Sequence, residues 1–182
     1  MTALIRALFV VFALAPAPLL AADYVDRAAL DELFAQLRVA QSAGEANDLT
    51  QQIWSYWLSP DDPELAAVML DARSATSIGN LPGALAILNG VVTRYPDYAE
   101  GWNQRATLYY LMGNLGASLA DIDKVLALEP RHFGALSGRV MIYLKQGKRA
   151  EALRDMVTAL AIDAYLSQRD LFPELAQNVT HV

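Results

Sequence analysis

The residues of this chain that could do acid–base or nucleophilic chemistry are not grouped by their spacing. The chain has two histidines, His132 and His181, and no cysteine, which excludes thiol nucleophiles and zinc thiolate sites. His132 follows Pro130 in what reads as a turn, where a histidine is more often solvated than catalytic. We therefore expect His132 to face solvent and neither histidine to act in catalysis.

The acidic residues favour structural roles. Asp62 stands before Pro63, which predicts a helix cap followed by a first helical position. Asp121 and Asp123 lie on what should be the outward face of a helix, so we expect both to be solvated. No glycine-rich phosphate loop, metal-ligand spacing or Ser/His/Asp grouping occurs. The sequence predicts a protein that is not an enzyme and takes no cofactor or metal ion; a hydrolase that uses Asp61 is a distant alternative.

Length, composition and charge narrow the class of protein. At 182 residues and 54% hydrophobic content, the chain can bury the core of one domain. Its formal net charge is −6 and it has no basic run. This argues against nucleic acid as a partner, because phosphate binding needs clustered Lys and Arg.

Residues 1–22 have the features of an export signal. An apolar stretch from Ala7 to Leu14 follows a weakly positive start, and two prolines break it ahead of Ala22. We predict cleavage after Ala22 or Ala21 and a periplasmic or secreted mature protein without a membrane span. The alternative is an uncleaved anchor, but this segment is shorter than the ~20 apolar residues that a spanning helix needs.

Residues 23–62 predict a helical hairpin. Apolar residues at helical spacing indicate a helix from Asp23 to about Ser42, ended by Gly44, and a partner helix from Leu49 to Leu58. The second helix carries an apolar, mainly aromatic cluster of Ile53, Trp54, Tyr56 and Trp57. Such a cluster could stack on a ligand, but we interpret it as the core of a terminal cap.

A repeat organises the rest of the chain. Gly79, Gly113 and Gly147 lie 34 residues apart, each just past an apolar-periodic segment, where a left-handed residue closes a helix. Other residues recur at the same interval, in the columns Ala84, Ser118, Ala152; Leu88, Ile122, Met156; Val91, Val125, Ala159; Arg105, Arg139; and Pro96, Pro130. Agreement across many columns at one offset predicts a chain of helical repeats.

The period and residue types resemble the tetratricopeptide repeat, a helix–turn–helix unit of this length. The best copy contains Trp102, Ala106, Tyr109, Gly113, Ser118, Ile122, Val125 and Pro130. The resemblance implies an all-α fold, an α-solenoid with three repeats over residues 63–164 (about 65–98, 99–132 and 133–166). It also implies a degenerate fourth copy from Asp31 to about Pro60. Apolar residues in the tail, Leu166, Leu171, Phe172 and Leu175, predict a capping helix over residues 165–182 that covers the last apolar face.

Local signals refine these helices. Asp97 followed by Glu100 predicts a capping pair at the start of the helix that contains Trp102. Trp102 lies on the apolar face of that helix, which predicts a core anchor. The capping helix begins either at Ser167, through a capping box, or at an Asp170 cap.

The first helix of each repeat lines a concave groove in tetratricopeptide arrays, and extended peptides or partner helices lie in it. Carried over by register, the groove would consist of Met69, Arg73, Thr76, Asn103, Thr107, Tyr110, Leu111, Ser137, Met141, Leu144 and Lys145. Amide, hydroxyl, aromatic and methionine groups suit a peptide better than a charged polymer. The alternative is a face that is only solvated, or that the N-terminal helices cover.

One property of chaperone-binding family members is missing. They grip the C-terminal carboxylates of a peptide with Lys, Arg and Asn at positions that here hold Met69, Arg73, Gln104, Gly134 and Gly138. Only Arg73 could bind a carboxylate strongly, and one exposed ion pair contributes about 0–1 kcal/mol. We expect no preference for acidic C-termini.

These observations predict a non-enzymatic periplasmic adaptor or scaffold with a protein or peptide partner. The alternative is a structural subunit of a cell-envelope assembly that contacts partners through its convex face.

Overall fold

The computed structural model describes residues 24–175, and within that range the protein is all-α. Its elements are α1 (Arg27–Leu37), α2 (Ala43–Leu58), α3 (Pro63–Ser77), α4 (Leu81–Arg94), α5 (Ala99–Leu111), α6 (Leu115–Leu128), α7 (Phe133–Lys145), α8 (Arg149–Ile162) and the 3₁₀ segment η1 (Ser167–Leu171). The predicted fold class is confirmed. The predicted signal peptide, residues 1–22, lies outside the described residues.

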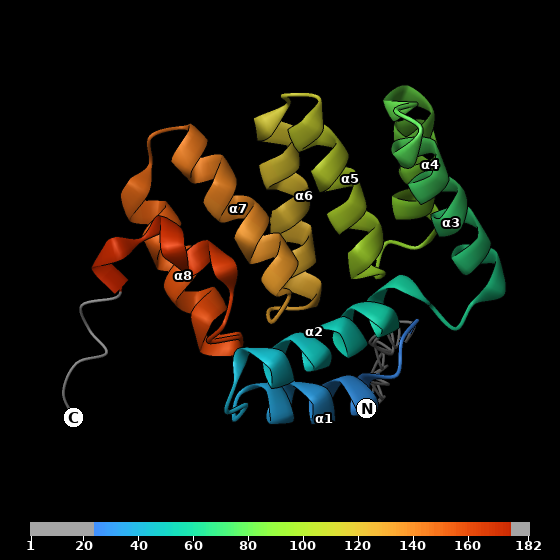
Figure 1. Cartoon of the computed structure of the whole chain (residues 1–182). Helices are drawn as coiled ribbons and strands as arrows, with labels where there is room; N and C mark the ends of the chain where they lie inside the picture. The colour runs from blue at the N-terminus through green and yellow to red at the C-terminus, as the bar shows by residue number, and fades with distance from the viewer. Residues whose placement is uncertain (1–23, 176–182) are drawn as a thin grey trace, which may run out of the picture.

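Helices α3 to α8 form three antiparallel hairpins that stand side by side, α3–α4, α5–α6 and α7–α8 (Figure 1). The hairpins turn at Gly79, Gly113 and Gly147, whose φ angles are 76°, 78° and 71°. Residues with a Cβ atom rarely adopt this conformation, so the turn itself requires the recurring glycine. The predicted α-solenoid is confirmed.

Small residues let the paired helices approach closely. The Ser118 hydroxyl of α6 donates a hydrogen bond to the Ala106 carbonyl of α5 at 2.7 Å, and both residues are buried. Leu88, Ile122 and Met156, which form one repeat column, are buried in separate clusters along the stack. Each hairpin thus buries an apolar face that it could not cover alone.

Asp and Asn side chains begin several helices. The Asp62 carboxylate accepts the N–H groups of the first turn of α3, with Pro63 at the first helical position, as predicted. Asn80 and Asn114 cap α4 and α6 in the same way at equivalent repeat positions. These asparagines follow the turn glycines directly, so the first two repeats close one helix and cap the next within two residues.

The predicted Asp97–Glu100 capping pair is wrong. Helix α5 begins after Tyr98, which makes no side-chain capping bond. Glu100 does not reach back to the helix start, because its buried carboxylate is hydrogen-bonded to Asn103, Gln104 and His132. A long-range contact therefore replaces the expected local one.

The N-terminal hairpin departs from the predicted repeat order. Helices α1 and α2 run across the ends of the later helices and do not stand beside α3 as a further repeat (Figure 1). Gly44, predicted to end the first helix, lies in the first turn of α2, where the Ser42 hydroxyl caps the helix by accepting the Glu45 N–H. The hairpin is therefore not a fourth stacked repeat.

The aromatic residues of this hairpin are core, as interpreted from the sequence. Ile53 and Trp57 of α2 are buried in one cluster with Phe34 of α1 and Phe133 of α7, and Trp54 packs against it. The cluster does not cap the end of the stack. It packs the hairpin onto the turns that join successive repeats.

The C-terminal segment is 3₁₀ within the described residues, not the predicted α-helical cap. Segment η1 begins after Leu166 without a side-chain capping bond, so the starts predicted at Ser167 and Asp170 are both wrong. Pro173 cannot continue an α-helical hydrogen-bond ladder. Phe172 nevertheless packs, 1% exposed, on the α7–α8 core. The segment covers the last apolar face in a different conformation from the one expected.

Candidate functional site

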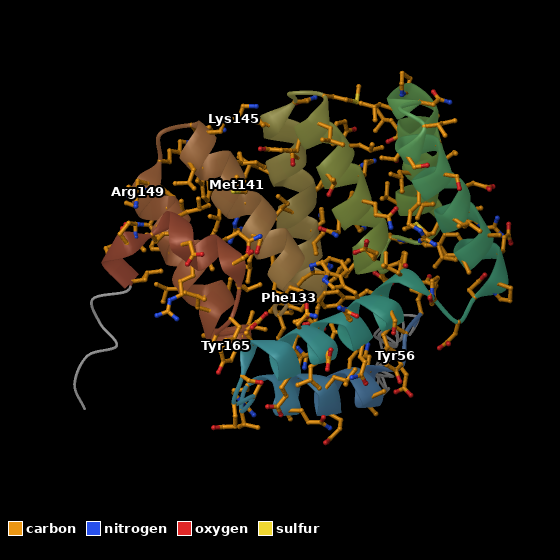
Figure 2. All side chains as sticks on the ribbon, viewed as in Figure 1. Tyr56, Phe133, Met141, Lys145, Arg149 and Tyr165 are labelled. Atoms are coloured by element: carbon orange, nitrogen blue, oxygen red, sulfur yellow. The ribbon has the colours of Figure 1, made fainter. Side chains whose placement is uncertain are left out.

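Helices α5 and α7 border a hollow of about 150 Å³, lined by Asn103, Ala106, Thr107, Tyr110, Ser118, Ile122, Gly134, Ala135, Gly138, Met141 and Ile142. Four predicted groove residues, Asn103, Thr107, Tyr110 and Met141, therefore surround one opening although they come from two repeats. Figure 2 shows Met141 on α7, between Phe133 at the start of that helix and Lys145 at its end. We call this space the α5–α7 hollow.

Two glycines of α7 shape this hollow. A Cβ atom added at Gly138 would lie 3.7 Å from Ile122 Cδ1, which is an ordinary contact, so packing does not require glycine there. A Cβ atom added at Gly134 would lie 2.6 Å from Trp54 Cη2, which is too close. The absence of a side chain at Gly134 therefore leaves room for Trp54 of helix α2, whereas its absence at Gly138 leaves open space over Ile122. The sequence showed only that these positions lack clamp side chains.

The polar groups of the hollow leave hydrogen-bond acceptors for a partner. The Asn103 side-chain amide donates to the Glu100 carboxylate at 2.9 Å, which leaves the Asn103 side-chain oxygen to accept. The Thr107 hydroxyl donates to the Asn103 carbonyl at 3.0 Å and keeps acceptor capacity of its own. A peptide backbone N–H group placed over the hollow would find acceptors here.

The predicted groove residues that carry charge are cationic. Lys145 Nζ lies 5.4 Å from the centroid of the Tyr110 ring, within the range of a cation–π interaction. Arg73 is half-buried and donates to the Leu58 carbonyl at 3.4 Å, which ties it to the end of α2. Its guanidinium is therefore less available to a partner than an extended side chain would be.

Helix α2 covers one end of this face. Trp54 packs at Gly134, and the Tyr98 hydroxyl, whose pKa burial raises, donates to the Trp57 carbonyl at 2.5 Å. Arg131, in the next inter-repeat turn, donates to Asp31 of α1 at 2.7 Å. The N-terminal helices thus cover part of the face, which was the alternative raised from the sequence, and leave the α5–α7 hollow open.

His132 is buried, so the expectation that it faces solvent is wrong. Its Nδ1 atom accepts the Ala135 N–H at 3.1 Å and caps α7, and its Nε2 atom lies 3.2 Å from the Glu100 carboxylate. Because Nδ1 accepts, the neutral ring carries its proton on Nε2 and donates to Glu100. His132 lies one repeat length after Tyr98, and both residues contact Trp57. This equivalent repeat position was the signal in the sequence that could have shown His132 to be buried.

Comparison with known proteins agrees with this architecture. No protein-family model matches the chain. It is 34% identical over 83 residues to a TPR repeat-containing protein of Rhizobium etli, covering 46% of this chain and 41% of that protein. Two crystal structures of MamA have similar folds, with TM-scores of 0.51 and 0.50, identities of 17% and 16%, and coverage of 72% and 79% of this chain and 74% of each of theirs.

The repeats of this chain are similar to tetratricopeptide repeats. The match to this chain spans about two fifths (41%) of the length of the Rhizobium relative. The similarity to MamA concerns the fold alone.

Three of the predicted groove residues are turned into the cores of the helical repeats. Met69 is fully buried in a cluster with Leu65 and Tyr98. Ser137 is 8% exposed, and its hydroxyl has no hydrogen-bond partner among residues 24–175. Leu144 is half-buried against the α7–α8 core. These three residues do not form an accessible groove surface.

The remaining predicted positions lie toward the turn ends of the first helices. Leu111 is 56% exposed and Lys145 is also exposed. Thr76 is half-buried, and its hydroxyl donates to the Ala72 carbonyl at 2.8 Å. They border the face without lining the α5–α7 hollow.

Arginine–carboxylate pairs join the helical repeats, which corrects the expectation that Asp121 is solvated. Arg105 donates to Asp121 at 2.7 and 2.8 Å and to Asn89 of the preceding repeat at 2.9 Å. Arg139 repeats the arrangement, with two bonds to Asp155 and one to the preceding repeat. The carboxylate bonds raise the pKa of both guanidinium groups. The column of arginines was visible in the sequence, but their partners were not.

Two further acidic residues that the sequence singled out lie at the surface. Asp61 and Asp123 are exposed, and Asp123 pairs with Arg139. Across residues 24–175, His, Asp and Glu side chains nowhere gather in threes as a metal site would require. None of the helices in this range has both the length and the apolar character needed to cross a bilayer.

Proposed function

We propose that this protein is a non-enzymatic interaction module that holds a segment of a partner protein in the α5–α7 hollow. The observation that carries the proposal is the hollow itself. Gly138 leaves apolar space over Ile122, and Met141 and Tyr110 stand at its walls. A methionine wall adapts to side chains of different shapes. Tetratricopeptide repeats are protein-interaction folds, which agrees with this use.

The chemistry of the hollow describes the segment that it would accept. An apolar side chain of the partner enters between Tyr110 and Met141, and the partner backbone donates to Asn103 and Thr107. Acidic C-termini gain little, because Arg73 is already held by the Leu58 carbonyl.

A hollow-filling substitution tests this proposal. Peptides selected by wild-type protein on an array would be titrated against Gly138→Leu, whose side chain occupies the space over Ile122. We expect binding to weaken about tenfold or more while the circular dichroism spectrum stays unchanged. Val157→Ala, on the outer helix α8, is the matched control, because Val157 is 51% exposed and away from the hollow.

The outcomes separate the candidate surfaces. Unchanged peptide binding by Gly138→Leu would contradict the proposal. Loss of binding in Val157→Ala alone would favour the convex face and a structural role in an envelope assembly. If Arg73→Ala loses binding only to peptides with acidic C-termini, Arg73 binds the terminal carboxylates of those peptides.

We also propose that the protein acts outside the cytoplasm, on the strength of the export signal in residues 1–22. Intact-mass measurement of protein from a periplasmic extract tests this. A mass that begins at Asp23 or Ala22 is expected, and retention of Met1 to Ala21 in a membrane fraction would contradict it.

A further inference from the structure

A second hollow, of about 280 Å³, lies between α2 and the turn that follows α8. Its lining includes three aromatic side chains, Trp54, Phe133 and Tyr165, together with Asp163 and Gln168. Figure 2 shows Phe133 and Tyr165 along the same side of α2. This hollow shares no lining residue with the α5–α7 hollow, so it is a separate site.

A buried carboxylate without a cation lines this hollow. Asp163 is 4% exposed, and one of its oxygens accepts the Tyr165 N–H at 2.9 Å. Among residues 24–175 no Lys, Arg or His pairs with Asp163, whereas the buried carboxylate of Asp121 pairs with Arg105. Burial raises the pKa of Asp163. A buried charge without a partner is costly, so a cation in the hollow would supply what the chain lacks.

A second acceptor lies nearby. The Gln168 side-chain oxygen is buried and has no hydrogen-bond partner among the described residues. Buried acceptors are normally satisfied, so this one indicates a missing donor. A carboxylate and a carbonyl oxygen together suit a ligand that carries N–H groups or positive charge, and they disfavour an anion.

The aromatic side chains favour an organic cation over a metal ion. Trp54 and Phe133 stand edge to face with ring centroids 5.6 Å apart, and Tyr165 is 42% exposed. Aromatic rings attract ammonium and guanidinium groups through their negative faces, and aromatic walls with a carboxylate suit such cations. Asp163 is the single carboxylate in the lining, and the other polar side chains, Asn47, Thr50, Ser167 and Gln168, are neutral, which suits a singly charged organic cation better than a divalent metal ion.

We propose that the hollow bounded by Trp54, Tyr165 and Asp163 binds an organic cation, that is, an alkylammonium or guanidinium group. This group comes either from a free small molecule or from a Lys or Arg side chain of a partner. The proposal does not depend on the proposed function of the α5–α7 hollow.

Nuclear magnetic resonance titration of the ¹⁵N-labelled protein tests the proposal with two cationic probes. Choline represents a free small cation, and N-acetyl-arginine methylamide represents an arginine within a chain. The neutral carbon isostere of choline, 3,3-dimethyl-1-butanol, is the control ligand. The indole N–H signal of Trp54 reports on the hollow, and that of Trp102, which donates to the Pro96 carbonyl, is the internal control.

We expect at least one cationic probe to shift the Trp54 signal saturably, with a Kd of about 1 mM, and to leave the Trp102 signal unchanged. Preference for choline would indicate a small-molecule ligand, and preference for the arginine probe a partner side chain. Equal shifts with the neutral isostere, or no saturable shift with either cation, would overturn the proposal.

Variants at the hollow sharpen the test. Asp163→Asn keeps an acceptor for the Tyr165 N–H but removes the charge, and should weaken cation binding about tenfold or more. Tyr165→Leu should weaken it several-fold, whereas Tyr165→Phe keeps the ring and should bind like wild type. Asp71→Asn, an exposed carboxylate on α3, is the matched control. Circular dichroism checks that the Asp163→Asn variant is folded. Wild-type affinity of this folded variant for the cationic probes would overturn the role of Asp163 in cation binding.

Discussion

The indole ring of Trp57 lies flat against the imidazole ring of His132, with centroids 4.0 Å apart and ring planes within 5° of parallel. This stack joins helix α2 to the turn between the second and third repeats. The same histidine caps α7 and contacts Glu100 of α5. One buried ring therefore connects the N-terminal hairpin to two repeats.

Replacing Trp57 should destabilise the whole fold. Trp57→Ala removes a buried ring from the cluster that holds α2, and we expect the free energy of unfolding in urea to fall by about 3–5 kcal/mol.

His132→Asn should destabilise the protein less than His132→Ala, because an asparagine can still accept the Ala135 N–H and cap α7. Equal stability of the two His132 variants would show that the cap contributes nothing.

Trp102 should contribute less than a buried tryptophan. It is half-buried, its indole N–H donates to the Pro96 carbonyl at 2.8 Å, and Arg105 lies 4.9 Å from its ring centroid. The predicted core anchor is therefore a partly exposed contact between repeats. We expect Trp102→Ala to cost about 2–3 kcal/mol, below the ~3–5 kcal/mol of a fully buried ring. A thermal melt like that of Trp57→Ala would contradict this ranking.

The glycines of the repeat should separate into two kinds. Gly147 has a φ of 71°, so Gly147→Ala should destabilise by about 1 kcal/mol. Gly90, inside α4, has open space where a Cβ atom would lie, so Gly90→Ala should stabilise by about 0.5–1 kcal/mol. Chemical denaturation measures the change in the free energy of unfolding of each variant. Changes of the same sign in both variants would contradict the distinction between the two glycines.

Asp163 should make stability depend on pH. Burial raises its pKa in the folded state, so the folded protein holds this proton more tightly than the unfolded chain does. The stability that protonation provides is present below the unfolded pKa of ~3.9 and is lost as pH rises through the folded pKa. Asp163→Asn should raise the melting temperature at neutral pH, with a gain that shrinks near pH ~3. A gain that grows on acidification would contradict this sign.

The sequence by itself determined the repeats. Glycine turns, the Asp62–Pro63 start and the apolar columns are local features, and each acts within one hairpin or between adjacent hairpins. Their register therefore predicted the helices of residues 63–162 and placed Asn103, Thr107, Tyr110 and Met141 on one face. The α5–α7 hollow itself depends on how closely two helices pack.

Only the tertiary structure decided where the N-terminal hairpin lies and which groove positions it leaves open. Its contacts join residues far apart in the chain, such as Trp54 with Gly134 and Trp57 with His132. A helical pattern shows that a face is apolar but not which distant surface will cover it. The sequence therefore predicted His132 to be a solvated turn residue and Met69 to be a groove residue. In the structure both are buried, and Met69 lies in a cluster with Tyr98.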